Sequence, residues 1–431
     1  MARASCAENR KCPVILLAAS LRWPLSARLA IRFLEYGFRV AAICPKGHCL
    51  RYVEGIEAYF PYRGISSLAS LENALQKIRP EIIIPCDDRV VWQLHELHRN
   101  RPDLRELIEA SLGAASGFEL IGCRDRLLET AHALGILIPT TQQITSEEDI
   151  HTWFARGETA GVLKLDGSWG GEGVAIVRLE EEAKAAFRDL SRQTGICTAY
   201  KRLLVNRDPL SLWDWKRQTQ PSIIMQQLIE GQPANSMLAC WKGEVLSIIS
   251  VEVLASQGET GAAYLVRVIE NERMTRAARL LANKLQLSGF FGFDYMIDRM
   301  TGLPYLIEVN PRCTQLGHLP LTQGSSLAGA LCAKLSGQVC VNDEASVLGK
   351  VVALFPQADQ WGAKDSLSDG AYHDVPQNQP RLVSELMRPI WPERQWISRV
   401  YHRLNPARKA EPIKYSFDIN LHAVPAQETE S

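Results

Sequence analysis

Three short segments of the sequence hold residue types whose spacing could support chemistry. In the first, Val162–Val174, Lys164 lies near the end of an apolar run and a glycine-rich stretch follows. The glycines of this stretch are Gly167, Gly170, Gly171 and Gly173. Glycines let a backbone approach phosphate oxygens and direct its amide groups at them, and a lysine adds a positive charge. The segment is equally compatible with a glycine-rich hairpin that carries a surface lysine, so by itself it leaves both interpretations open.

The second segment contains acidic residues, and its spacing is more informative about function than that of the first. Glu308 and Asn310 are two residues apart in an apolar run, so they share one face of a strand, and Asp294 lies in the preceding strand-like run. Pairing of the two runs as a hairpin brings three oxygen donors together on an otherwise apolar sheet. Uncompensated carboxylates there are costly, and a bound Mg²⁺ relieves the cost. An exposed sheet face with chance acidic residues is the alternative, but it does not explain the Pro311-Arg312 pair that follows.

The third segment, Ile223–Gly231, is an apolar strand that breaks into a polar bend. A chain that crosses between two lobes at such a bend could offer backbone groups to the edge of an adenine ring. This pattern alone is a weak signal.

The first 110 or so residues must position some of these groups, and they alternate between strands and helices. The expected strands and helices are Pro13–Ala19, Leu25–Tyr36, Arg39–Cys44, 57–61, Ser67–Ile78 and Glu81–Pro85. Continuous apolar strands separated by amphipathic helices predict a parallel α/β sheet covered on both faces. Ligands lie at the carboxyl ends of strands in such sheets. Arg22 and Trp23 follow the first strand, and Asp87 and Asp88 follow the last, so these four residues are candidates for substrate contacts. Asp87 and Asp88 could instead simply cap the next helix.

From about residue 140 the strands become longer and more alternating, which predicts antiparallel pairing and an α+β region. The expected strands are Val162–Leu165, Val174–Arg178, Ile223–Leu228, Ser236–Trp241, Glu244–Leu254, Ala262–Val268, Phe290–Ile297 and Tyr305–Asn310. Helices are expected at about Asp125–Leu134, Met274–Leu287 and Ser326–Leu335. Gly349–Phe355 predicts one more strand, and the segment Met387–Arg408 mixes aromatic and basic residues. For that segment, packing against the preceding domains is favoured over lying on a membrane surface.

Composition excludes several classes of protein. Lys+Arg and Asp+Glu are equal at 48 each, and no basic stripe precedes residue 385, so a nucleic-acid partner is not expected. No apolar stretch approaches the length of a membrane span, and Val14–Ser20 is better explained as a buried strand than as a signal peptide. The 11 cysteines are scattered without a CxxC pair, which indicates reduced thiols, a cytoplasmic location and no zinc site.

The order of the three segments resembles the ATP-grasp superfamily, as represented by biotin carboxylase, carbamoyl phosphate synthetase and D-alanine–D-alanine ligase. The similarity runs from about residue 115 to 320. The resemblance implies a pre-ATP-grasp α/β domain over 1–115, a two-lobed ATP-grasp domain over 116–335 and a C-terminal extension over 336–431. The nucleotide lobe would cover about 140–230 and the metal lobe about 231–335. The insertion at 201–221, which carries two tryptophans, is either a substrate cover or a surface elaboration.

The resemblance also implies roles for individual residues. Asp294, Glu308 and Asn310 would hold Mg²⁺, for which Mn²⁺ could substitute, and Arg267 and Arg312 would be catalytic. ATP would contact Arg126, Lys164, Gly170, Gly171, Gly173, Gln226, Gln227, Ile229 and Glu230. The chain departs from the family at the hinge, where Gln226 replaces a frequent acid, and after it, where Gln232-Pro233 stands in place of a ribose-binding acid. Glu230 would have to supply that contact.

The implied reaction is an ATP-dependent ligation. A carboxylate would be activated as an acyl phosphate and then coupled to an amine, with release of ADP and phosphate. The glycine-rich loop would close over the reaction as a lid. Three alternatives stay open: a bicarbonate-using carboxylase or carbamoyl-type enzyme, a non-catalytic ATP-binding protein, and a scaffold or peripheral membrane protein that uses the aromatic and basic segment near the carboxyl terminus. The expected partners are small-molecule carboxylates and amines, and a homodimer is compatible with the sequence.

Overall fold

The computed structural model describes residues 13–157, 159–165, 173–193, 222–259, 261–322, 325–338, 346–361, 370–389, 394 and 413–415. Gly170 and Gly171, the 201–221 insertion and most of the aromatic and basic segment at 387–408 lie outside these residues. Within the described part, no helix is both long enough and apolar enough to cross a lipid bilayer.

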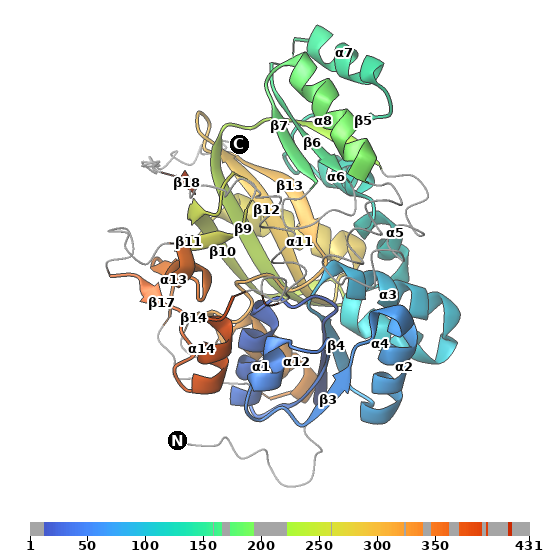
Figure 1. Cartoon of the computed structure of the whole chain (residues 1–431), viewed down its shortest axis with the longest axis vertical. Coiled ribbons are helices and arrows are strands. Elements are labelled where there is room, and N and C mark those ends of the chain that lie inside the picture. The colour runs from blue at the N-terminus through green and yellow to red at the C-terminus, as the bar shows by residue number, and fades with distance from the viewer. Residues whose placement is uncertain are drawn as a thin grey trace, which may run out of the picture.

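The amino-terminal region is a parallel sheet in the order β3-β2-β1-β4 (Figure 1). Its strands are β1 (Val14–Ala18), β2 (Arg39–Cys44), β3 (Ala58–Pro61) and β4 (Ile82–Pro85), and its helices include α1 (Leu25–Glu35), α2 (Ser67–Ile78), α3 (Asp88–Asn100) and α4 (Arg105–Leu112). Every residue of β1 and β4 is buried, because helices or the rest of the protein cover both faces. The predicted parallel α/β arrangement is confirmed.

A small antiparallel sheet, ordered β5-β8-β6-β7, lies at one end of the molecule (Figure 1). Its strands are β5 (Thr141–Ile144), β6 (Gly161–Leu165), β7 (Val174–Val177) and β8 (Ile223–Gln227), and α7 (Glu147–Ala155) and α8 (Glu180–Gln193) pack on it. Trp153 and Leu163 are buried in the core between these helices and the sheet. The short helices α5 (Phe118–Ile121) and α6 (Arg124–Ala133) precede this sheet in the chain.

The largest sheet follows the order β13-β12-β9-β10-β11-β16-β17. Its strands are β9 (Gly231–Trp241), β10 (Glu244–Ser256), β11 (Ala263–Ile269), β12 (Gly289–Asp298), β13 (Pro304–Asn310), β16 (Val351–Ala353) and β17 (Tyr372–His373). Helix α11 (Glu272–Leu285) covers the face that includes Leu238 and Phe291. Helix α12 (Leu327–Ser336) covers the opposite face and also contacts α1, so that the large sheet and the amino-terminal sheet share one core.

The carboxyl-terminal residues are part of the large sheet. β16 pairs with β11, β17 pairs with β16, and β18 (Ile413–Lys414) pairs with β10. Between them lie α13 (Gln357–Trp361) and α14 (Pro380–Leu386), and the short pair β14 (Pro320–Thr322) and β15 (Ser325–Ser326) precedes α12. The strand predicted over Gly349–Phe355 is thus present as β16. The expected division at residue 336 stays a prediction, although the strands beyond it complete the sheet that precedes it.

A buried ionic cluster ties this carboxyl-terminal segment to α1. Arg28 donates to the Asp374 carboxylate and backbone carbonyl, and His318 Nε2 lies 2.6 Å from Asp374 Oδ2. Arg32 Nε donates to the His318 carbonyl at 2.7 Å. All four side chains are buried. Three distant parts of the sequence are therefore joined at one point, where each charge has a partner.

Candidate functional site

One cavity of about 1330 Å³ lies where the amino-terminal sheet, the small antiparallel sheet, the large sheet and the carboxyl-terminal segment meet. Its walls come from the strand ends of the amino-terminal sheet, from β6–β8, from β9–β13 and from the region of α13 and α14. Pockets for one drug-sized ligand typically measure roughly 300–1,000 Å³. The cavity therefore has room for more than one bound molecule.

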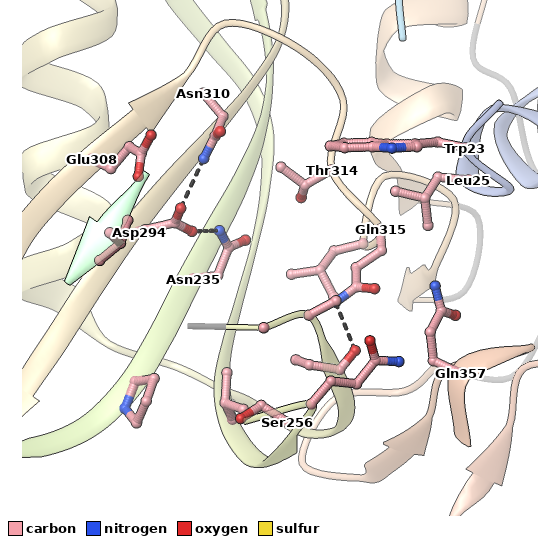
Figure 2. A pocket seen from close by; sticks show the side chains of 18 of the residues that line it. Trp23, Leu25, Asn235, Ser256, Asp294, Glu308, Asn310, Thr314, Gln315 and Gln357 are labelled. Atoms are coloured by element: carbon pink, nitrogen blue, oxygen red, sulfur yellow. Dashed lines mark hydrogen bonds between the residues drawn. The ribbon is translucent and has the colours of Figure 1, made fainter. Parts of the chain in front are cut away.

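The predicted acidic cluster is assembled on one side of this cavity (Figure 2). In the β12–β13 hairpin, Asp294 pairs with Glu308 and Gly292 pairs with Asn310. Asn310 Nδ2 donates to Asp294 Oδ2 at 2.8 Å. The strand register thus places the three predicted metal-binding side chains together, as the two-residue spacing of Glu308 and Asn310 requires.

A fourth side chain, Asn235 on β9, joins the cluster and was not identified from the sequence. Asn235 lies opposite Asp294 in the antiparallel register, and its Nδ2 donates to Asp294 Oδ1. Its own Oδ1 is buried without a hydrogen-bond partner among the described residues. A single asparagine far from the hairpin in sequence carries no local signal, and only the pairing of β9 with β12 brings it here.

Two cations border the cluster. Lys164 on β6 is buried, and burial, followed by the charge of Arg124, lowers its pKa to about 8. Arg124 donates to Glu308 Oε1 at 2.5 Å from the first turn of α6. Arg126, the sequence-based choice for a phosphate contact, is exposed and does not line the cavity. Two residues along a helix correspond to about 200° of rotation, which separates Arg126 from Arg124.

The electrostatics of the cluster fit a divalent cation. Burial, reinforced by the Glu308 charge, raises the pKa of Asp294 to about 6. Burial also acts to raise the pKa of Glu308, but Arg124 and Lys164 outweigh it and the pKa of Glu308 is lowered. Two close carboxylates, an asparagine and the unpartnered Asn235 oxygen match the oxygen ligands that Mg²⁺ takes alongside phosphate. Within the described residues, no three His, Cys, Asp or Glu side chains are placed so that they could hold a metal ion, so amide oxygens would have to complete the set.

The proposed nucleotide side of the cavity contains part of the predicted set. Gln226, Gln227 and Ile229 line the cavity at the end of β8. Gln226 is buried, with its Nε2 3.4 Å from Thr141 Oγ1. Glu230 is exposed and outside the lining. Its role as a ribose contact therefore remains a prediction that the cavity does not support.

Only the end of the glycine-rich loop can be placed. Gly173 is described, and its carbonyl accepts a hydrogen bond from Leu165 N at 2.8 Å. This bond joins the last residue of β6 to the residue that precedes β7. Gly170 and Gly171 lie outside the described residues.

Arg312 is held between the two domains that the sequence predicted. Its Nε donates to Asp88 Oδ2 at 2.8 Å, and its guanidinium carbon lies 4.7 Å from the centroid of the Trp23 ring. Arg312 Nη2 also reaches Asn310 Oδ1 at 3.3 Å. Burial acts to lower the pKa of Arg312, but Asp88 and neighbouring acids raise it above its usual value. Arg312, Trp23 and Asp88 therefore form one unit beside the acidic cluster.

Of the other candidates from the amino-terminal sheet, Arg22 and Asp88 line the cavity, whereas Asp87 has a structural role. Arg22 lines the cavity and donates from Nε to the Lys46 carbonyl at 2.8 Å. Asp87 is buried, caps α3 through Val90 N and accepts hydrogen bonds from Ser20 and Leu21. Asp87 thus matches the capping interpretation, and Asp88 next to it faces the cavity.

Arg267 is separated from the cluster by strand alternation. Val253 and Val266, which pair with each other in β10 and β11, line the cavity. Their neighbours Glu252 and Arg267 therefore point to the opposite face, where Arg267 Nη1 lies 2.8 Å from Glu252 Oε1. Its side chain is 47% exposed there. A catalytic role for Arg267 has no geometric support in this conformation.

Comparison with known proteins agrees with this geometry. Residues 209–315 match a family model described as an ATP-grasp domain. An N5-carboxyaminoimidazole ribonucleotide synthetase in complex with ADP is 14% identical with a TM-score of 0.56, covering 79% of this chain and 81% of that one. No curated protein sequence matches the chain.

Two further solved structures share the fold. The biotin carboxylase domain of Hydrogenobacter thermophilus 2-oxoglutarate carboxylase, with MgADP, ADP and bicarbonate, is 14% identical with a TM-score of 0.56, covering 79% of this chain and 74% of that one. The carboxyaminoimidazole ribonucleotide synthase of Aspergillus clavatus, with ATP, is 11% identical with a TM-score of 0.58, covering 79% and 80%. At these identities the likeness shows the fold alone.

Proposed function

We propose that this chain, which belongs to the ATP-grasp superfamily, is an ATP- and Mg²⁺-dependent ligase that joins a small carboxylate to an amine. One observation carries the proposal. Lys164 of the small sheet and the Asp294–Glu308–Asn310 cluster of the large sheet face the same cavity, with Arg124 and Arg312 on either side. Cations and carboxylates arranged in this way suit a nucleoside triphosphate with its metal ion.

The residues of this chain would act by binding and positioning. Asp294, Glu308, Asn310 and the Asn235 oxygen would hold Mg²⁺, which supplies charge neutralisation at the transferring phosphoryl group. Lys164 and Arg124 would place positive charge beside the phosphate oxygens. Gln226, Gln227 and Ile229 would border the base at the end of β8. Arg312, fixed by Asp88 and Trp23, would orient the carboxylate.

The proposed reaction has two steps. In the first, a carboxylate oxygen attacks the γ-phosphorus of ATP, the bond to the β-phosphate oxygen breaks, and ADP leaves with the electron pair. In the second, the amine lone pair attacks the acyl carbon, a C–N bond forms, and the C–O bond to phosphate breaks. Phosphate takes that electron pair, and the amine releases a proton to water.

Release of ADP tests this proposal directly. The purified chain is incubated with MgATP and with pools of small carboxylates and amines, and ADP release must require Mg²⁺ and one member of each pool. Glu308→Gln should lower that rate at least about tenfold while the unfolding temperature changes little, because Glu308 faces the cavity, where it would hold the metal, rather than the core. Glu244→Gln is the matched control, since Glu244 at the start of β10 in the same sheet is exposed, pairs with Lys334 and does not line the cavity. Binding of MgADP without any substrate-dependent ADP release would indicate a non-catalytic nucleotide-binding protein instead.

A carboxylase that activates bicarbonate is the second candidate. The solved structures with this fold include enzymes named for carboxylation, and one of them holds bicarbonate. Bicarbonate could occupy the position beside Arg312 that we assign to the carboxylate. ADP release that requires bicarbonate, with transfer of labelled carbon to an acceptor, would favour this candidate over the ligase.

A further inference from the structure

The cavity extends well beyond the acidic cluster. Figure 2 shows Asp294, Glu308 and Asn310 on one side and Trp23, Leu25 and Gln357 on the other, with Thr314 and Gln315 between them. A nucleotide that reaches from the end of β8 to the metal ligands would leave this second part open. We call the part lined by Leu25, Gln357, Leu386 and Arg388 the distal pocket.

The distal pocket contains a buried hydrogen-bond acceptor that has no partner. Gln357 lines the pocket from the start of α13, and its Oε1 is buried without a hydrogen bond to any described residue. Gln315, which faces the same region, already donates from Nε2 to the Ala263 carbonyl at 3.0 Å. Burial of an acceptor without a hydrogen bond is unfavourable, and a ligand N–H or O–H group would remove that cost.

Arginines and one glutamate form the charged end of the distal pocket. Glu385 is buried and pairs with Arg388 at 2.9 Å and with Arg394, and all three side chains line the cavity. Helix α14, which carries Glu385, packs on the 3₁₀ turn Cys49–Tyr52, and Cys49 of that turn lines the same cavity. Two guanidinium groups on one carboxylate leave an excess positive charge. Arg394 donates from Nε, Nη1 and Nη2 to Pro389 and Glu385, whereas Arg388 bonds to Glu385 through Nη1. Guanidinium forks bind carboxylate and phosphate in two-point fashion, so the guanidinium of Arg388 suits an anion at this end of the pocket.

We propose that the distal pocket binds the second substrate, and that this substrate is a small amine that carries its own anionic group, a carboxylate or a phosphate. The inference rests on the proposed ligase function. The anion lies at Arg388, with the charge of Arg394 nearby, while Glu385 holds both guanidinium groups in place. A donor group of the substrate bonds to Gln357 Oε1, and apolar contacts come from Leu25 and Leu386. The amine then extends toward Arg312 and the acyl group.

A binding experiment tests this inference without the identity of the first substrate. The full chain is saturated with MgADP, and its thermal shift is recorded with amino acids, with aminoalkyl phosphates, and with neutral amino-acid amides and amino alcohols of matched size. We expect a shift from one of the two anionic classes and none from the neutral compounds. The class that binds decides between carboxylate and phosphate.

Two arginine variants on the same segment make the test specific. Arg388→Gln should weaken binding of the anionic amine at least tenfold, and Arg388→Lys should weaken it less, because the charge remains but the fork is lost. Arg381→Gln is the matched control, since Arg381 is exposed on α14 and does not line the cavity. Gln357→Leu should weaken the same binding several-fold, since it removes the acceptor.

The inference is overturned if neutral amines bind as well as anionic ones, if neither class binds, or if Arg388→Gln binds like the unmodified chain. If MgADP still binds in those cases, the ATP-dependent function remains supported, and only the assignment of an anionic amine as second substrate is rejected. Loss of the MgADP shift itself in the unmodified chain would instead count against the ATP-dependent function.

Discussion

The two sides of the cavity are built in different ways. On the metal side, Asp294, Glu308 and Asn310 come from one hairpin, and Asn235 comes from the strand that pairs with it. On the distal side, Leu25 and Gln357 are more than 300 residues apart in sequence, and α1 and the carboxyl-terminal segment meet through the Arg28–Asp374 pair. Strand register therefore fixes the three proposed metal ligands of the hairpin locally, whereas the distal pocket depends on contacts between distant segments. Substitutions that alter strand pairing should therefore affect the acidic cluster, whereas substitutions at contacts between distant segments should affect the distal pocket.

The largest effect should come from breaking the long-range contact. Asp374→Asn leaves the buried Arg28 without its counterion, and loss of one partner of a buried ion pair typically costs about 3–5 kcal/mol. We expect a marked fall in the unfolding temperature, measured by scanning calorimetry. Asp103→Asn, which removes an exposed partner of Arg101, is the control and should change it little. An unchanged unfolding temperature in Asp374→Asn would mean that other contacts hold the distal side together.

On the metal side, Lys164→Ala should act on chemistry rather than on stability. Loss of one charged group that contacts phosphate costs roughly a hundredfold or more in turnover. The buried ammonium is itself unfavourable for folding, so the unfolding temperature should not fall. Lys184→Ala, which removes a surface pairing with Glu180, provides the matched control in steady-state assays of ADP release. If Lys164→Ala is as active as the control, the nucleotide does not bind beside Lys164.

Asp88 connects the two sides, and its variant should have an intermediate effect. The sequence made Asp88 a candidate substrate contact, and contact with the amine predicts that Asp88→Asn raises the KM for the amine. Its hydrogen bond to Arg312 Nε predicts instead that the variant lowers kcat about tenfold, because Arg312 loses its fixed orientation. The split between kcat and KM in initial-rate measurements distinguishes the two roles. A change confined to the KM for the amine would assign Asp88 to the substrate.

The smallest effect should be a pH dependence that is confined to the metal side. The pKa of Lys164 is lowered to about 8, chiefly by burial, so its ammonium is charged below that pH and neutral above it. MgADP affinity should therefore be highest below pH 8 and should weaken as the pH rises, by at most about tenfold per unit. Calorimetric titration from pH 7 to 9.5 measures this. Lys164→Arg keeps its charge and should show a flatter profile, and equal profiles would mean that Lys164 does not titrate in this range.

Much of the fold followed from the sequence because its signals are local. The apolar runs of β1, β2 and β4 have no polar alternation, which marks strands buried on both faces. The two-residue spacing of Glu308 and Asn310 required a shared strand face, and the hairpin partner of that strand contained Asp294. Alternation along a strand and the pairing of neighbouring strands are both readable without any distant contact.

Other features depended on geometry that no short segment encodes. Arg124 rather than Arg126 faces the cavity because the rotation of α6 is fixed by its packing, and both arginines fit the same sequence pattern. Arg267 turned away from the cluster because the register of β10 and β11 sets which face each residue takes. In each case, moving the residue by one or two positions along its helix or strand changes whether its side chain faces the cavity. The packing of neighbouring elements determines which position faces the cavity.

By itself the sequence determined the parallel amino-terminal sheet, the antiparallel strands that follow and the set of carboxylates on one hairpin. Tertiary structure alone decided that Asn235 joins those carboxylates, that Asp88 holds Arg312, and that Gln357, Glu385 and Arg388 form a distal pocket. The physical reason is the distance over which each constraint acts. Hydrophobic periodicity and the pairing of the β12–β13 hairpin act over a few residues, whereas the pairing of Asn235 with Asp294 spans 59 residues and burial of Arg28 against Asp374 requires segments more than 300 residues apart to meet.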